Sequence, residues 1–238
     1  MKKVPSIKEL NKFAWKFKNR KTETHLRIFS PYFLWTLLHT KITPNQLTMF
    51  WVLLVIITSP FFLIYNFSVH IVASAIILLC LQLDMVDGSL ARYKKQFSKK
   101  GAIIDFIGSW LMAILPQTFL AITYFIHTGK TWIIIALPFF LIGFIMKELI
   151  PLKEMFIYQK KIKDDKPKDK GRLHNIYSFA RKLMLIDYSI EMLFISILIG
   201  IPEYYILFYA FSYNLYWIAK TIHVFIKKED LSKEVFLT

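Results

Sequence analysis

The sequence predicts an all-α integral membrane protein with six transmembrane helices and an N-terminal amphipathic helix at the membrane interface. Of its 238 residues, 55% are hydrophobic and only 20% are charged, whereas soluble domains average about 45–50% apolar and about 25% charged residues. No Asp, Glu, Lys or Arg lies between Lys41 and Asp84 or within 106–129, and an α-helix needs about 20 apolar residues to cross a bilayer. These observations exclude a soluble enzyme, a disordered chain and a disulfide-framed secreted domain.

The N-terminal segment, residues 1–40, is basic. Within 7–20, apolar and aromatic residues alternate with lysines, which favours an amphipathic helix lying on anionic lipid. An ordinary basic cytoplasmic arm is the alternative.

Six apolar runs follow, at 46–66, 69–91, 102–126, 131–150, 183–200 and 203–226. Asn66 and Ser68 mark the first tight connection, and residues 127–129 mark the third. Asp187 and Glu191 interrupt the fifth run. We expect one six-helix membrane domain over residues 41–226, followed by a cytoplasmic tail, 227–238.

The basic residues orient these spans. All lysines and arginines except Lys130 lie within 1–46, in the connection after the second span (92–100), within 147–182, or from Lys220 onward. The positive-inside rule therefore predicts a multi-pass protein with both termini in the cytoplasm, in the cell membrane if the source is prokaryotic. Topology also accounts for the net charge of +15, so the expected partner of these charges is the lipid bilayer and not nucleic acid.

Carboxylates gather at the cytoplasmic ends of spans two and three. Asp84 and Asp87 are three residues apart, so they share one helix face. Gly101 opens span three, and Asp105 follows one turn later. Oxygen ligands of this kind bind hard cations such as Mg²⁺ or Mn²⁺, which in turn bind phosphate oxygens. Ionisable groups at membrane depth are costly and usually serve function.

Small residues and one arginine accompany these carboxylates. Gly88 and Ala91 leave a strip where a ligand or another backbone can approach closely. Arg92, at the end of the helix, carries a guanidinium suited to phosphate oxygens. The set therefore fits a complex of a metal ion with a diphosphate better than a cation channel.

The pattern Asp84-x-x-Asp87-Gly88-x-x-Ala91-Arg92, then eight residues and Gly101-x-x-x-Asp105, resembles the signature of the CDP-alcohol phosphotransferase family. The stretch Thr43-Pro44-Asn45-Gln46-Leu47-Thr48 resembles a segment common in these proteins. The resemblance implies transfer of a phospho-alkyl group, usually phosphatidyl, from a CDP-linked lipid donor to a small alcohol acceptor, with release of CMP and with Mg²⁺ or Mn²⁺ as cofactor. It also implies six helices and a homodimer, and a role in phospholipid biosynthesis.

The same resemblance implies roles for individual residues. The expected metal ligands are Asp84, Asp87 and Asp105. The expected CDP-binding residues are Asn45, Asp84, Gly88, Ala91, Arg92 and Gly101. The expected catalytic positions are Asp105 and Ser109.

Ser109 departs from the family pattern, which has a fourth Asp at this position as metal ligand and presumed general base. A neutral hydroxyl cannot act as a base near pH 7. The alternative function is therefore a homologue that binds CDP-lipid and metal without turnover. Glu148, Asp187 and Glu191 could supply a carboxylate from other spans, or pair with nearby basic residues such as Lys147.

Overall fold

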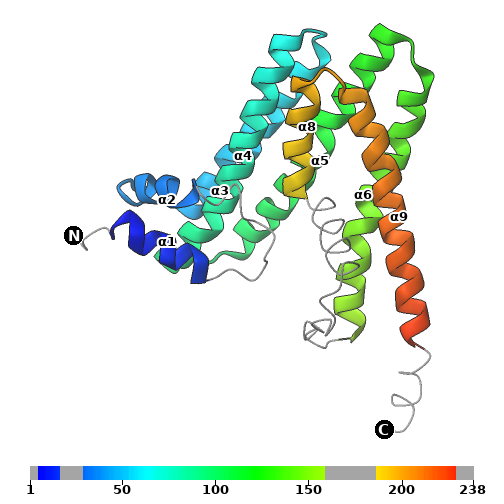
Figure 1. Ribbon diagram of the computed structural model, residues 1–238. Helices are drawn as coiled ribbons and strands as arrows, with labels where there is room; N and C mark the ends of the chain where they lie inside the picture. The colour runs from blue at the N-terminus through cyan, green and yellow to red at the C-terminus, as the bar shows by residue number, and fades with distance from the viewer. Residues whose placement is uncertain (1–4, 17–28, 159–185, 229–238) are drawn as a thin grey trace. The chain divides into compact units, whose positions relative to one another are not determined.

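The computed structural model of the chain describes residues 5–16, 29–158 and 186–228, and every element in these ranges is a helix (Figure 1). The chain divides into two compact units. Among the described residues, the first unit comprises 5–123 and 186–200, and the second comprises 124–158 and 201–228.

The first unit contains the N-terminal helices and all of the expected metal-binding, CDP-binding and catalytic positions, which lie between Asn45 and Ser109. Its elements are α1 (Ile7–Lys16), α2 (Ser30–Leu38), α3 (Pro44–Thr58) with the 3₁₀ helix η2 (Ser59–Leu63), α4 (Phe67–Lys94), most of α5 (Lys99–Thr128) and α8 (Ile186–Leu198).

A capping box starts α3. The backbone N–H of Gln46 donates to Thr43 Oγ1 (3.3 Å), and the backbone N–H of Thr43 donates to Gln46 Oε1 (2.9 Å). Pro44 occupies the first turn, where its missing N–H costs nothing. The helix tightens into η2 at Ser59, beside Pro60, which cannot donate the next helical hydrogen bond.

The turn between α4 and α5 is shorter than the sequence indicates. Asn66, which marks the expected tight connection, also caps the start of α4 by accepting from the N–H of Val69 (3.2 Å). The helix then continues through Lys94, and Lys95 ends it in the left-handed region (φ 53°). Because α5 begins at Lys99, the connection that we expected over 92–100 comprises only residues 95–98.

The second unit pairs α6 (Thr131–Tyr158) with α9 (Pro202–Lys228), which run side by side in Figure 1. Gly143 permits their close approach, because a Cβ there would lie 2.9 Å from Tyr213 Cβ. Asn214 Nδ2 donates to the carbonyl oxygen of Phe139 (2.7 Å). At the other end, Lys130 Nζ and Glu203 Oε1 form an ion pair of 2.8 Å.

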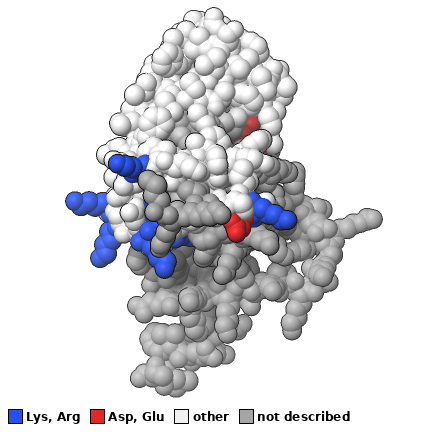
Figure 2. Space-filling view, turned by 90° about the vertical axis from the view of Figure 1, so that its left-hand side faces the viewer, with Lys and Arg blue, Asp and Glu red and all other residues white. Residues whose placement is uncertain are grey.

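Four helical segments among the described residues are long and apolar enough to cross a membrane. They are Pro44–Leu63, Phe67–Lys94, Lys99–Thr128 and Thr131–Ile150, and they match the first four expected spans to within three residues at each end. Apolar side chains such as Ile57 (62% exposed) and Val72 (59% exposed) cover their outer surfaces, as lipid contact requires. In Figure 2 a broad, mostly uncharged surface lies above a band of Lys and Arg side chains.

The two remaining expected spans are helical, but neither is among the segments that are both long and apolar enough to cross a membrane. The expected span 183–200 corresponds to α8, and its first residues lie outside the described ranges. The expected span 203–226 corresponds to α9, which is long enough but carries five tyrosines and Asn214. These polar groups lower the mean hydropathy of α9. A membrane helix can carry them because part of α9 faces α6 and not lipid. The count of six spans stays a prediction.

The N-terminal segment contains two helices where the sequence predicted one. A Ser6–Glu9 capping box starts α1, and Leu10 is buried (1% exposed) where α1 meets α2. The expected helix over 7–20 is observed over Ile7–Lys16, and residues 17–20 lie outside the described ranges. Helix α2 was not anticipated, and the interfacial position of α1 stays a prediction.

Candidate active site

Three carboxylates from two helices meet in the first unit. Asp84 and Asp87 lie on α4, and Asp105 lies one and a half turns into α5. One oxygen from each carboxylate lies within 4.8 Å of the other two. The structure therefore brings together the three residues that the sequence predicted as metal ligands.

Asp87 is held by two side chains of α3. Its Oδ2 accepts from Thr48 Oγ1 (2.7 Å) and from Trp51 Nε1 (2.9 Å). Thr48 and Trp51 are three residues apart, so they share one face of α3. Asp87 itself is only 6% exposed, so these donors offset part of the cost of removing a carboxylate from water.

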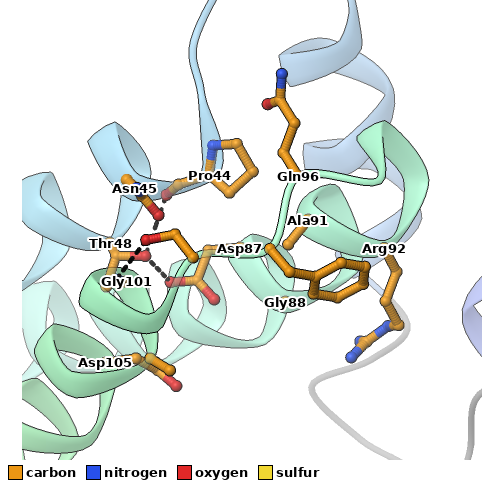
Figure 3. Close-up of a pocket in the computed structure, with 13 residues that line it drawn as sticks. Pro44, Asn45, Thr48, Asp87, Gly88, Ala91, Arg92, Gln96, Gly101 and Asp105 are labelled. Atoms are coloured by element: carbon orange, nitrogen blue, oxygen red, sulfur yellow. Dashed lines mark hydrogen bonds between the residues drawn. The ribbon is translucent and has the colours of Figure 1, made fainter.

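A cavity of about 220 Å³ opens beside this cluster (Figure 3). In that view Asp87 and Asp105 lie on one side of the cavity, and Gln96 and Arg92 lie on the other. The lining residues are Pro44, Asn45, Thr48, Asp87, Gly88, Ala91, Arg92, Gln96, Phe97, Ser98, Gly101, Ala102 and Asp105.

Two glycines of α5 allow it to lie against α3. A Cβ at Gly101 would overlap Asn45 Oδ1, and a Cβ at Gly108 would lie 2.5 Å from the Trp51 ring. Gly101 and Gly108 are seven residues apart and therefore face the same way. Asp105 lies between them on α5, so this close approach brings it near α3, whose Thr48 and Trp51 hold Asp87.

The N-terminus of α5 borders the cavity. Ser98 caps it by accepting from the N–H of Gly101 (2.9 Å), and Ser98, Gly101 and Ala102 all line the cavity. The first turn of a helix carries partial positive charge and favours anions nearby.

Arg92 and Gly88 form the opposite wall. Arg92 Nη2 donates to Ser89 Oγ (3.3 Å), and the guanidinium lies 3.5 Å from the position that a Cβ would take at Gly88. The cavity thus has a guanidinium and a helix N-terminus beside three carboxylates. Such a distribution of charge suits a phosphate group bridged to a cation.

A divalent cation fits the chemistry of this cluster. Asp105 Oδ1 is buried and has no hydrogen-bond partner among the described residues, although buried carboxylate oxygens are normally satisfied. Asp105 therefore has an oxygen available as a ligand close to two further carboxylates. Oxygen-only ligand sets are the ones that Mg²⁺ and Mn²⁺ prefer.

Two of the expected site residues do not line the cavity. Asp84 belongs to the carboxylate cluster but is not part of the cavity wall. Ser109, one turn beyond Asp105 on α5, does not line the cavity either. Thus position 109 adds no charged ligand to the cluster.

The other candidate carboxylates have separate surroundings. Glu148 pairs with the buried Lys147 (2.8 Å) in the second unit, which is the structural alternative that the sequence left open. Glu191 is half-buried on α8 in the first unit. The side chain of Asp187 lies outside the described part of the structure.

Sequence reasoning missed the supports of Asp87. Thr48 lies in the Thr43–Thr48 stretch that resembles the family, so the sequence already indicated that Thr48 could lie near the site. Apart from its helical spacing from Thr48, nothing in the sequence singled out Trp51, because aromatic residues are frequent in membrane helices. Gln96, Phe97 and Ser98 were read only as a basic connection.

The curated proteins gave no match. The model of the CDP-alcohol phosphatidyltransferase family matches residues 41–224, a range that includes every cavity-lining residue and all three clustered carboxylates. Because this range exceeds half of the chain, the chain belongs to the CDP-alcohol phosphatidyltransferase family.

Proposed function

We propose that this protein transfers a phosphatidyl group from a CDP-linked lipid donor to a small alcohol acceptor and releases CMP. The observation that carries the proposal is the cluster of Asp84, Asp87 and Asp105 beside a cavity that also contains Arg92. Membership of the family supports phosphatidyl transfer. The donor, the acceptor and the metal ion are parts of the proposal.

The carboxylates have the role of holding a divalent cation, Mg²⁺ or Mn²⁺, against the diphosphate of the donor. When bound, such an ion neutralises charge that develops on the phosphate oxygens and on the departing CMP. Asp105 contributes its unpartnered Oδ1. Asp87 contributes a carboxylate already fixed by hydrogen bonds from α3.

The opposite wall binds the nucleotide. Arg92 has a planar guanidinium that pairs with phosphate oxygens in a bidentate manner. Gly88 and Ala91 leave space for the CDP group beside it, and the N-terminus of α5 at Gly101 adds backbone dipoles. Asn45, at the start of α3, lies within reach of the same group as a neutral donor or acceptor.

Ser109 supports a second candidate, a homologue that binds CDP-lipid and metal without turnover. It stands where the family has a carboxylate base, its hydroxyl is neutral, and it does not line the cavity. In a protein that turns over, Asp105, one turn before Ser109 on α5, accepts the alcohol proton.

The arrangement in the membrane is part of the same proposal. The termini and the connection at 95–98 lie in the cytoplasm, six helices span the bilayer, α1 lies at the interface, and two copies form a homodimer. The basic band beside an uncharged surface in Figure 2 supports this orientation. The cavity would then open at the level of the lipid headgroups, where a CDP-lipid presents its diphosphate.

The test is CMP release from CDP-diacylglycerol by the full-length protein in detergent with Mg²⁺ or Mn²⁺. The acceptor panel contains glycerol phosphate, inositol phosphate, serine, ethanolamine and choline. We expect acceptor-dependent release by the unmodified protein and loss of at least 100-fold in Asp84→Asn. Glu203→Gln, which removes a carboxylate from the second unit, is the matched control and should retain activity.

Ser109→Asp separates the two candidate functions. Release by the unmodified protein would show that Ser109 is compatible with transfer. Activity gained only in Ser109→Asp would contradict transfer and favour the homologue without turnover. Absence of metal-dependent CDP binding in the unmodified protein would contradict both.

A further inference from the structure

Trp51 has an arrangement that packing alone does not require. Its side chain is fully buried (0% exposed), and a buried indole N–H needs an acceptor. Here the acceptor is Asp87 Oδ2, 36 residues away on another helix. A carboxylate as acceptor makes this hydrogen bond charge-assisted and therefore stronger than one to a neutral group.

Both donors act on one oxygen of Asp87. Thr48 Oγ1 (2.7 Å) and Trp51 Nε1 (2.9 Å) both approach Oδ2. A carboxylate oxygen has two lone pairs, so two donors use the capacity of Oδ2. The oxygen left for a cation is Oδ1.

The ring of Trp51 also contacts the helix that carries Asp105. The missing side chain of Gly108 leaves the space in which the edge of the indole lies, since a Cβ there would come within 2.5 Å of it. Gly108 is three residues after Asp105, on the adjacent turn of α5. Trp51 therefore joins the two helices that supply the carboxylates.

We propose that Trp51 is a positioning residue for metal binding: with Thr48 it fixes Asp87 Oδ2, presents Oδ1 to a divalent cation and spaces Asp87 from Asp105. This inference rests on the proposed function, because it assumes that the cluster binds a cation. Partners of this kind orient metal ligands, and their loss typically lowers metal affinity about 10–100-fold.

The test measures Mn²⁺ binding by the full-length protein in detergent. Free Mn²⁺ is followed by electron paramagnetic resonance, and CMP release is measured at increasing Mn²⁺ in parallel. Trp51→Phe removes the N–H and keeps an aromatic ring beside Gly108. Trp217→Phe is the matched control, because Trp217 Nε1 donates a hydrogen bond of the same length (2.9 Å), to Asn214 Oδ1 in the second unit.

We expect Trp51→Phe to raise the Kd for Mn²⁺ roughly 10-fold and to regain CMP release when Mn²⁺ is raised in proportion. Trp217→Phe should bind Mn²⁺ as the unmodified protein does. Thr48→Val should weaken Mn²⁺ binding, whereas Thr48→Ser, which keeps the hydroxyl, should restore it. A role in packing alone would lower thermal stability without changing the Kd.

Unchanged Mn²⁺ affinity in Trp51→Phe would overturn the inference. If Trp51→Phe does not fold, equal Mn²⁺ affinities of Thr48→Val and Thr48→Ser would overturn it instead. An unmodified protein that binds no Mn²⁺ would remove the basis of both this inference and the proposed metal dependence. Mn²⁺ binding without CMP release from any acceptor would contradict only the proposed transfer.

Discussion

A methyl group meets very different surroundings at two glycines that line the same cavity. At Gly101 it would overlap Asn45 Oδ1, whereas at Gly88 it would lie 3.5 Å from the Arg92 guanidinium, an ordinary van der Waals distance. A substitution at Gly101 therefore tests the packing of α5 on α3, whereas a substitution at Gly88 tests the space available to a ligand.

We expect Gly101→Ala to lower the free energy of unfolding by about 1–3 kcal/mol, because overpacking moves α5 or Asn45. Gly88→Ala should leave stability nearly unchanged and raise the KM for the CDP-linked donor. Thermal unfolding in detergent and donor titrations measure the two effects. A Gly88→Ala protein with unaltered KM would show that the donor does not approach this strip.

The first turn of α3 is stabilised by its capping residues. The capping box that begins α3 satisfies two otherwise unpaired groups through Thr43 and Gln46. Thr43→Ala should lower the free energy of unfolding by about 1 kcal/mol and weaken donor binding, because Asn45 and Thr48 lie within the next turns. Thr36→Ala, which removes a hydroxyl that donates to the carbonyl oxygen of Tyr32 in the preceding turn of α2, is the control for thermal unfolding.

Helix pairing in the second unit depends on Gly143. A Cβ there would lie 2.7 Å from Asn214 Nδ2 and 2.9 Å from Tyr213 Cβ. Gly143→Ala should separate α6 from α9 and cost about 1–3 kcal/mol. Gly129→Ala would meet no atoms within 4 Å but would place a side chain at φ +67°, so it reports backbone strain without helix separation. Protease sensitivity of α9 should rise in Gly143→Ala alone.

Features that depend on residues close together in the chain could be predicted from the sequence, whereas contacts between distant residues could not. The first four spans are continuous apolar runs, and the carboxylates of α4 are three residues apart, so local patterns predicted both. Asp87 and Trp51 are 36 residues apart, and no local pattern pairs them. Helix α9 was predicted from an apolar run, but its polar residues reflect packing on α6, which hydropathy cannot reveal.

At the scale of the whole molecule, the distribution of basic residues predicts the orientation in the membrane. The single cysteine, Cys80, is fully buried, so introduced cysteines can be labelled individually. Phe97 lies between α4 and α5 and is 75% exposed, and Gly129 lies exposed at the turn between α5 and α6. These two positions should lie on opposite sides of the membrane.

We expect a membrane-impermeant maleimide to label Gly129→Cys in intact cells and Phe97→Cys only after permeabilisation. The unmodified protein should remain unlabelled in both conditions, because Cys80 is inaccessible. Labelling of Phe97→Cys in intact cells would reverse the orientation and place the cavity on the wrong side for a cytoplasmic CDP-lipid.

The thirteen residues that line the cavity all lie between Pro44 and Asp105. A ribosome delivers a chain from its N-terminus, and units generally fold in that order. Every wall of the cavity has therefore been synthesised before α6 begins at Thr131. The nascent protein can bring α3, α4 and α5 together while the second unit is still being translated, so the order of synthesis favours early assembly of the site.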